Sequence, residues 1–289
     1  MQIIAVANQK GGCGKTTTAI NLSAALAKHG HRVLLVDFDP QGHATLGLGY
    51  DPNSFDKSAY HVMVDYLRIS AVAVGTRVAR LHLLPSNILL GGAELALRGV
   101  PGKELILGEQ LRSVARDYDF CVIDCSPSLG LLMLNALVAS TGVLIPVQAH
   151  FYSLDGLKRI LDTMRHIRAR FYPCRVAPLG VVLTFVEDRT ALSKRSRRAF
   201  AACSGLWSST RSFTSRWPWR RLPARGRRSS RSHRTTKALW NTRPSPRRPS
   251  PVCMLPKLSM SPRISLTDAA LSDQEACDES RRIASIFRA

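Results

Sequence analysis

Short apolar runs alternate with longer stretches of helical periodicity over the first two thirds of the chain. The runs that predict strands lie at residues 2–7, 33–37, 81–84, 121–124, 142–147 and 179–185. The stretches that predict helices lie between them, at residues 15–29, 103–116, 129–140 and 154–170. The strand runs lack a clean alternation of apolar and polar residues, which is typical of strands buried on both faces. The pattern therefore predicts an α/β fold with a doubly wound, mostly parallel sheet covered by helices.

A glycine-rich segment follows the first predicted strand. Residues 10–17 read Lys-Gly-Gly-Cys-Gly-Lys-Thr-Thr and lead into the helix predicted from Lys15. The glycines let successive backbone N–H groups line a concave anion site at a helix N-terminus. Lys15 is placed to reach the β- and γ-phosphates of a nucleoside triphosphate, and the Thr16 hydroxyl to ligate Mg²⁺. The nucleotide-binding residues expected from this P-loop are Gly11, Gly12, Cys13, Gly14, Lys15, Thr16 and Thr17.

A simple connecting turn is the alternative for the glycine-rich segment. The order of strand, loop, Lys-Thr pair and helix favours the phosphate site.

Three aspartates lie at the ends of predicted strands. Asp37 and Asp39 follow the second run, and Asp124 ends the fourth. Because parallel strands place their carboxyl ends at the sheet edge where ligands bind, we expect these carboxylates beside the phosphate loop. Asp124 can hold Mg²⁺ through its water shell, as the partner of the Thr16 hydroxyl. A strand-end cap is the alternative role for Asp124.

Four sequence blocks resemble one known family. Residues 8–18, with Gln9 in place of the consensus glycine and an additional Lys10, resemble the deviant Walker A motif of the ParA/Soj family of DNA-partitioning ATPases. Residues 32–45 are similar to the second acidic motif of that family, and residues 121–127 to its Walker B strand. Residues 144–148, followed by residues 152–157, resemble the stretch that comes next in the family. The blocks occur in family order, and the resemblance covers residues 1 to about 190.

The resemblance implies an ATPase that uses ATP and Mg²⁺ and closes as a homodimer around two nucleotides. In the family, Asp39 orients the attacking water, Asp37 lies near the metal and Lys10 reaches the nucleotide of the other subunit. Lys10, Lys15 and Asp39 are therefore candidate catalytic residues, and Thr16, Asp37 and Asp124 candidate metal ligands. For Lys10, a solvated loop cation is the alternative.

The resemblance also implies partners. The ATP-bound dimer would bind DNA without sequence preference in chromosome or plasmid segregation, and a ParB-like, centromere-bound protein would stimulate hydrolysis. Arg189 lies in a stretch similar to one where the family has a DNA-contacting arginine, although a solvated surface arginine fits it equally well. Relatives of the MinD type position other cargo and end in a membrane-binding amphipathic helix. Residues 279–289 lack a broad apolar face of that kind.

The most apolar stretch, residues 129–147, does not predict a membrane span, since polar residues and Gly142 divide it into helix, turn and strand. The N-terminus enters the first strand directly, so we expect a cytoplasmic protein without a membrane span. The family resemblance implies that this protein is associated with the nucleoid and does not bind a membrane. Seven cysteines without a C-x-x-C pair fit reduced thiols.

The composition changes abruptly after Lys194. No Asp or Glu occurs between Asp188 and Asp268, and Arg, Ser, Pro and all four Trp are concentrated there. We therefore divide the chain into an ATPase domain, residues 1–194, and an irregular or disordered basic region, residues 195–289. This region could bind nucleic acid, form a solvated cationic linker, or be encoded out of frame relative to the family. The third explanation is favoured, and it leaves open a degenerate product without activity.

Overall fold

The structure of the protein is a computed structural model that describes the backbone of residues 1–148, 153–185, 211–213 and 252–255. Its strands are β1 (Gln2–Val6), β2 (Val33–Phe38), β3 (Val74–Gly75), β4 (Leu81–Leu84), β5 (Phe120–Cys125), β6 (Gly142–Gln148), β7 (Ala177–Thr184), β8 (Arg211–Phe213) and β9 (Val252–Leu255). Its α-helices are α1 (Lys15–Lys28), α2 (His43–Gly47), α3 (Ala59–Val64), α4 (Ala93–Ala96), α5 (Ile106–Ser113), α6 (Leu131–Ala139) and α7 (Ser153–Arg170). Short 3₁₀ turns are η1 (Pro52–Ser54), η2 (Ile69–Ala71) and η3 (Ile88–Gly92).

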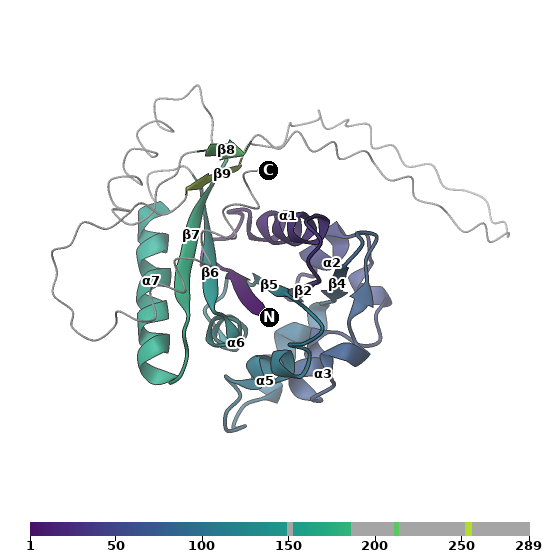
Figure 1. Ribbon diagram of the computed structural model, residues 1–289. Coiled ribbons are helices and arrows are strands. Elements are labelled where there is room, and N and C mark those ends of the chain that lie inside the picture. The colour runs from purple at the N-terminus through teal and green to yellow at the C-terminus, as the bar shows by residue number, and fades with distance from the viewer. Residues whose placement is uncertain (149–152, 186–210, 214–251, 256–289) are drawn as a thin grey trace, which may run out of the picture.

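The strands form one sheet in the order β3-β4-β2-β5-β1-β6-β7-β9-β8 (Figure 1). The pairs from β4 through β7 are all parallel. β3 pairs antiparallel at one edge, and β9 and β8 add antiparallel strands at the other. The mostly parallel, doubly wound sheet expected from the sequence is confirmed.

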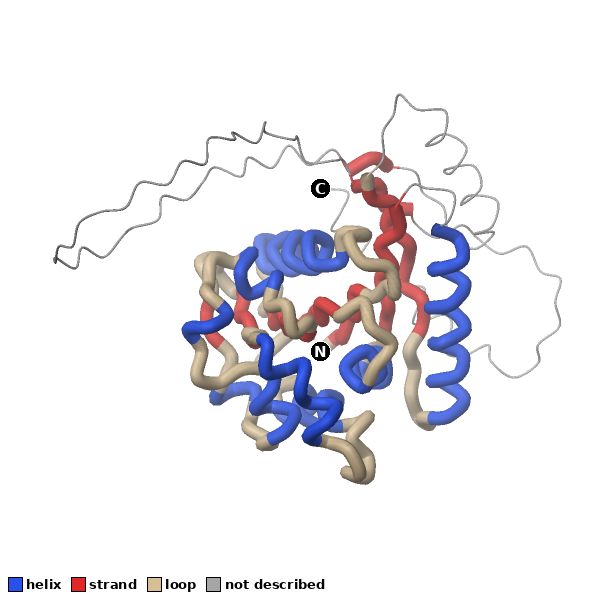
Figure 2. Tube along the Cα trace, turned by 180° about the vertical axis from the view of Figure 1, so that it is seen from behind, coloured by secondary structure: helices blue, strands red, loops and turns tan. Residues whose placement is uncertain are grey.

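Helices cover both faces of the sheet, as Figure 2 shows from behind. Val33 and Leu35 of β2 belong to the apolar cluster that contains Leu26 of α1. Leu34 and Val36, one residue along the same strand, belong to the larger cluster built with α3, α5, α6 and α7. Successive strand residues point to opposite faces, so a strand covered on both sides must be apolar throughout. This explains why the strand runs showed no polar alternation.

All six predicted strands are present, and their ends differ from the predicted ones by at most two residues. Two predicted helices are shorter than expected. α5 begins only at Ile106, after a turn in which Gly102 has a positive φ of 73°. α6 begins at Leu131 because Gly130 is extended, with φ −118° and ψ −166°. Among the described residues, no helix is long and apolar enough to cross a membrane.

The region expected to be irregular, residues 195–289, contributes only β8 and β9 to the described part of the chain. Most of that region, and Arg189, lie outside the described residues. The proposed division at Lys194 therefore stays a prediction.

Candidate functional site

The glycine-rich segment forms the loop between β1 and α1. Gly12 and Gly14 adopt left-handed backbone conformations, with φ of 69° and 89°. Such values favour glycine because a Cβ would be strained there. α1 begins at Lys15, and its N-cap, Gly14, has no side chain that could accept from the N–H groups of the first turn. The backbone N–H groups of the first turn are therefore directed at whatever anion occupies the loop.

Residues from three strand ends hold this loop in place. The Gln148 amide donates to the Gly12 carbonyl at 2.9 Å, and the Thr184 hydroxyl donates to the Cys13 carbonyl at 2.8 Å. Asn8 ties the start of the loop to β6, since its Nδ2 donates to the Pro146 carbonyl at 2.6 Å. The carboxyl ends of β1, β6 and β7 thus shape the loop together.

The two loop lysines lie in different environments. Lys15 is 7 % exposed, and its Nζ donates to the Lys10 carbonyl at 3.1 Å, across the loop. Lys10 is exposed at the surface. The Lys15 ammonium is thus held inside the loop, while the Lys10 ammonium is free to approach another molecule. Thr17 is exposed beside them, and Thr16 is half-buried.

Asp37 and Asp124 are register partners on the neighbouring strands β2 and β5, and both are fully buried. Asp37 Oδ2 accepts hydrogen bonds from the backbone N–H and the hydroxyl of Thr45, each at 2.7 Å. Burial raises the pKa of Asp37 to about 6, and these hydrogen bonds oppose the shift. Asp37 therefore keeps much of its negative charge near neutral pH.

Asp124 is the least satisfied group of the site. Neither carboxylate oxygen has a hydrogen-bond partner among the described residues. Burial, and then the charge of Asp37, raise the pKa of Asp124 to about 8, while the Thr16 hydroxyl nearby opposes the shift. A buried carboxylate without partners is costly, and a cation is what would satisfy it.

The donors present fit Mg²⁺. Carboxylate and hydroxyl oxygens are hard ligands, and Mg²⁺ commonly takes one or two carboxylates together with water and phosphate oxygens. Within the described part of the chain, no group of three or more His, Cys, Asp or Glu side chains is arranged for a metal. A cation at Asp124 and Thr16 would therefore depend on water and phosphate for its remaining ligands.

Asp39 lies in the tight loop that follows β2 and is 9 % exposed. Its Oδ1 accepts from the Gln41 N–H at 3.0 Å, and its carbonyl accepts from the Gly42 N–H at 3.0 Å. Gly42 has a φ of 62°, and a Cβ there would lie 2.9 Å from Pro52 Cγ. Glycine is thus required where the loop turns into α2.

The sequence predicted no individual role in the site for several polar residues that build it. They are Asn8, Thr45, Ser86, Gln148 and Thr184. Their common signal is position, because each follows or ends a strand at the carboxyl edge of the sheet, or lies in the first helix after one. A polar side chain at such a place, buried or half-buried, is a candidate for holding the loops.

Burial favours the neutral thiol form of the buried cysteines. Burial raises the pKa of the Cys13 thiol in the loop, with the Lys15 charge opposing the shift. Burial also raises the pKa of Cys121 and Cys125, which lie in the core cluster on the α6 side of β5. These thiols serve packing.

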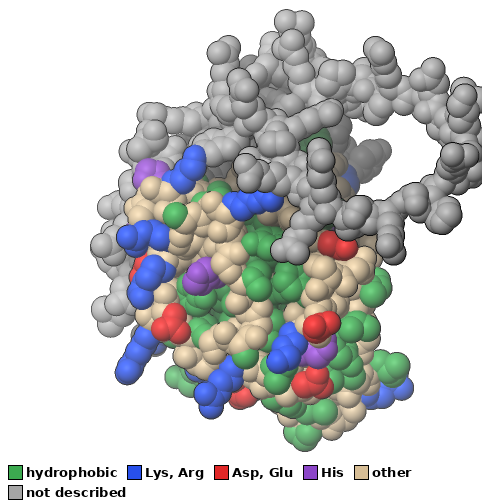
Figure 3. Space-filling view, turned by 90° about the vertical axis from the view of Figure 1, so that its right-hand side faces the viewer, with side chains coloured by type: hydrophobic (Ala, Val, Ile, Leu, Met, Phe, Trp, Pro, Cys, Tyr) green, Lys and Arg blue, Asp and Glu red, His purple; other side chains and the backbone are tan. Residues whose placement is uncertain are grey.

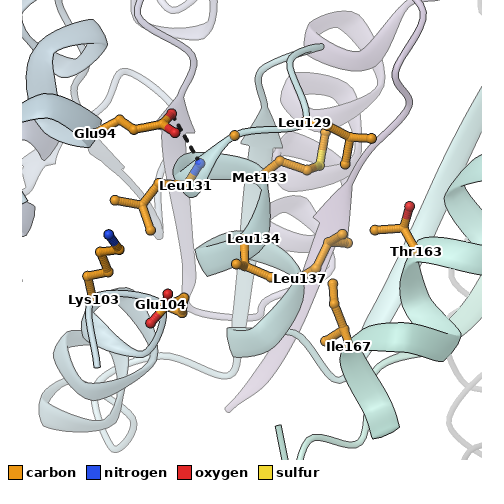
Figure 4. A pocket seen from close by; sticks show the side chains of 11 residues that line it. Glu94, Lys103, Glu104, Leu129, Leu131, Met133, Leu134, Leu137, Thr163 and Ile167 are labelled. Carbon is orange, nitrogen blue, oxygen red and sulfur yellow. Dashed lines mark hydrogen bonds between the residues drawn. The ribbon is translucent and has the colours of Figure 1, made fainter. Parts of the chain in front are cut away.

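A cavity of about 340 Å³ lies apart from the phosphate loop, along α6, with α7 on one side and Glu94, Lys103 and Glu104 on the other (Figure 4). Apolar side chains of α6 and Ile167 of α7 line it, with Glu94, Lys103 and Glu104 at its polar side. Glu94 Oε2 lies 3.4 Å from the Leu131 N–H, at the start of α6. The Glu94 carboxylate thus caps the N-terminus of α6 from another element.

Comparisons with known proteins agree with this architecture. A family model described as an AAA domain matches residues 1–174. The sporulation initiation inhibitor protein Soj of Bacillus subtilis is 45 % identical over 191 residues, which cover 66 % of this chain and 75 % of Soj. The chromosome partitioning protein ParA of Myxococcus xanthus is 41 % identical over 192 residues, or 66 % of this chain and 68 % of that protein.

Among solved structures, cobyrinic acid a,c-diamide synthase from Mycobacterium smegmatis, with bound ATP analog and magnesium, superimposes with a TM-score of 0.67. It is 39 % identical and covers 70 % of this chain and 82 % of its own. The similarity to each of these three proteins covers 66 to 70 % of this chain, about the length of the part that precedes the change in composition after Lys194.

Proposed function

Because the chain belongs to the ParA/Soj family of partitioning ATPases, we propose that it binds ATP with Mg²⁺ at the β1–α1 loop and hydrolyses the γ-phosphate. The observation that carries the proposal is the buried pair Asp37 and Asp124 beside the loop, with both Asp124 oxygens lacking partners. Two buried carboxylates without a bound cation would destabilise the fold, whereas a nucleotide-bound cation would compensate their charge.

Each residue of the loop takes a separate task. Lys15 exchanges the Lys10 carbonyl for the β- and γ-phosphates, a short movement within the same loop. Thr16, Asp124 and Asp37 hold Mg²⁺, which when bound neutralises phosphate charge. Backbone N–H groups of residues 11–17 bind the phosphate oxygens.

Asp39 orients the attacking water. Gln41 occupies Oδ1 of Asp39, so the carboxylate is held in one direction at the rim of the site. Lys10, exposed on the loop surface, stabilises transition-state charge on the nucleotide of a second subunit. Chemistry therefore requires a homodimer that closes around two nucleotides.

The partners follow from the family. The ATP-bound dimer binds DNA without sequence preference, with Arg189 as one contact, and a ParB-like protein bound to a centromere stimulates hydrolysis. The protein acts in the cytoplasm, on the nucleoid, in chromosome or plasmid segregation. The names of Soj and of the Myxococcus ParA support this assignment.

ATP hydrolysis by the purified full chain tests the enzymatic part of the proposal. We expect Mg²⁺-dependent phosphate release that falls at least about 100-fold in Lys15→Ala. Lys28→Ala, on the exposed last turn of α1, is the control cation and is expected to hydrolyse ATP as the wild type does. Hydrolysis that persists in Lys15→Ala would point to a contaminating enzyme.

DNA binding separates partitioning from other uses of the fold, since the Mycobacterium smegmatis structure carries the name of a synthase. We expect ATP-dependent binding to unrelated DNA duplexes, weakened steeply by salt. Hydrolysis without DNA binding would favour a different cargo or substrate.

A further inference from the structure

We propose that Ser86 is a positioning residue for Asp39, acting through a closed ring of buried hydrogen bonds. The inference rests on the proposed function, in which the Asp39 carboxylate orients the attacking water. Ser86 follows β4, is fully buried, and lies 47 residues away from Asp39 in the sequence. The second acidic motif, residues 32–45, does not contain it.

The ring has four members. The Ser86 hydroxyl donates to the Asp39 carbonyl at 2.7 Å, and the Ser86 N–H donates to the Thr45 hydroxyl oxygen at 3.1 Å. That hydroxyl donates to Asp37 Oδ2 at 2.7 Å. The ring closes through the Asp39 N–H, which lies 3.4 Å from Asp37 Oδ1. Asp39 is therefore held at both its N–H and its carbonyl.

Holding both backbone groups fixes the direction in which the Asp39 carboxylate leaves the chain. The Gln41 N–H fixes the carboxylate itself through Oδ1. Without the Ser86 hydroxyl, the Asp39 carbonyl would keep only the Gly42 N–H. A small displacement of a water-orienting group lowers the rate of reaction more than it lowers ligand affinity.

Ser86 is well supported for such a task. The carbonyl of the preceding residue, Pro85, accepts from the Ala59 N–H at 2.8 Å, at the start of α3. The following residue, Asn87, accepts from the Ser58 hydroxyl at 3.2 Å. These two hydrogen bonds hold the segment after β4 against the start of α3. Ser86, between them, therefore has a fixed position beside the Asp39 loop.

The kinetic test compares Ser86→Ala with Ser140→Ala. Ser140 is also buried and donates to a backbone carbonyl, that of Ala136, but it lies at the end of α6 away from the loop. For Ser86→Ala we expect kcat to fall about 10-fold with the affinity for ATP changed less than about 2-fold. Ser140→Ala should retain the wild-type kcat. Thr45→Ser, which keeps the hydroxyl, should have a higher kcat than Thr45→Val.

A double variant separates positioning from general destabilisation. In the Asp39→Ala background the group to be positioned is gone, so Ser86→Ala should change the single-turnover rate less than about 2-fold. An undiminished 10-fold loss in that background, or an unchanged kcat in Ser86→Ala alone, would overturn the proposal.

Amide hydrogen exchange on the nucleotide-free chain tests the ring without catalysis. We expect faster exchange of residues 39–45 in Ser86→Ala and unchanged exchange of that segment in Ser140→Ala. If the wild type proves not to hydrolyse ATP, the proposed function fails while this result still decides whether Ser86 holds the loop. Equal protection of residues 39–45 in wild type and Ser86→Ala would overturn the inference.

Discussion

At the scale of single residues, Asp124 lowers the stability of the cation-free fold and at the same time suits a bound cation. Asp124 lies on β5, between β2 and β1 and in register with Asp37, and its buried carboxylate has no hydrogen-bond partner among the described residues. The folded, cation-free chain must therefore hold a proton there or bear an unpaired charge. Asp124 therefore suits Mg²⁺ but lowers the free energy of unfolding of the chain when no cation is bound.

Replacing Asp124 by Asn should stabilise the nucleotide-free chain. The isosteric amide cannot ionise, so at pH 8 the free energy of unfolding should rise by about 2 kcal/mol. Urea unfolding, followed by far-UV circular dichroism of the backbone, measures this change. Mg²⁺-dependent ATP binding should be lost in the same variant. A less stable Asp124→Asn would contradict the unpaired state of this carboxylate.

The pH dependence of stability follows from the same pair. Burial raises the pKa of Asp37 to about 6 and that of Asp124 to about 8, above the ordinary value near 4. Between about pH 4 and pH 8 the folded chain thus binds more protons than the unfolded chain, and stability falls as the pH rises. Thermal unfolding at pH 5.5 and pH 8 should show this decrease, and Asp124→Asn should reduce it.

Gly42 is the backbone residue on which the Asp39 loop depends. Gly42→Ala would add strain at a φ of 62° and place a Cβ 2.9 Å from Pro52 Cγ. Gly99→Ala is a matched control, since Gly99 has a φ of 83° but open space around the added Cβ. We expect Gly99→Ala to cost about 1 kcal/mol and Gly42→Ala at least about 1 kcal/mol more, by urea unfolding. Equal costs would show that the contact with Pro52 is relieved by a small movement.

At the scale of elements, the sequence predicted the long strands and helices and missed the short ones. Six strands were recognisable because most of their residues are apolar and pack into the clusters on the two faces of the sheet. α2, α3 and α4 span five, six and four residues, too short to show a helical period. Their positions are set by tertiary contacts, such as the Ala59 N–H bonding to Pro85.

The candidate site divides in the same way. The phosphate loop and the aspartates could be predicted because each lies in a short sequence motif at the end of a recognisable strand. The residues that hold them, such as Ser86 and Thr184, could not, because their partners are 47 and 171 residues away. Such long-range hydrogen bonds depend on strand order, which the sequence pattern alone does not specify.

The ends of β6 and β7 should contribute to nucleotide affinity by holding the loop. Thr184→Val keeps the shape and removes the hydrogen bond to the Cys13 carbonyl, which should weaken ATP binding about 3- to 10-fold. Thr163→Val is the control, since the Thr163 hydroxyl donates to the Arg159 carbonyl within α7, beside the cavity that lies apart from the phosphate loop. Calorimetric titration with Mg²⁺–ATP measures both. Equal affinity in the two variants would show that β7 does not shape the loop.

At the scale of the whole molecule, the chain combines two different compositions. Residues 1–188 are nearly balanced in charge, and on the face in Figure 3 acidic and basic side chains are interspersed among apolar ones. The excess of +21 comes almost entirely from the stretch between Asp188 and Asp268, which has no Asp or Glu. The proposed phosphate site thus precedes a segment whose composition is unlike that of ordinary soluble domains.

We expect the gene to explain this segment. If it is out of frame, another frame downstream of codon 194 should encode alternating apolar strand and amphipathic helix patterns with acidic residues restored. The nucleotide sequence, checked by peptide mass spectrometry of the protein from its native cells, decides this. Native peptides from the Arg- and Trp-rich sequence as printed would show that the basic segment is a real part of the protein.

ATP-dependent dimerisation of the full-length chain tests the central claim most directly. Light scattering should show the mass doubling from 31.8 kDa when Mg²⁺ and ATP are added. Asp39→Ala should trap that dimer, since it removes the water-orienting group, and Lys15→Ala should remain monomeric. A folded wild-type chain that stays monomeric with ATP, or a dimer formed equally well by Lys15→Ala, would contradict the proposed nucleotide switch.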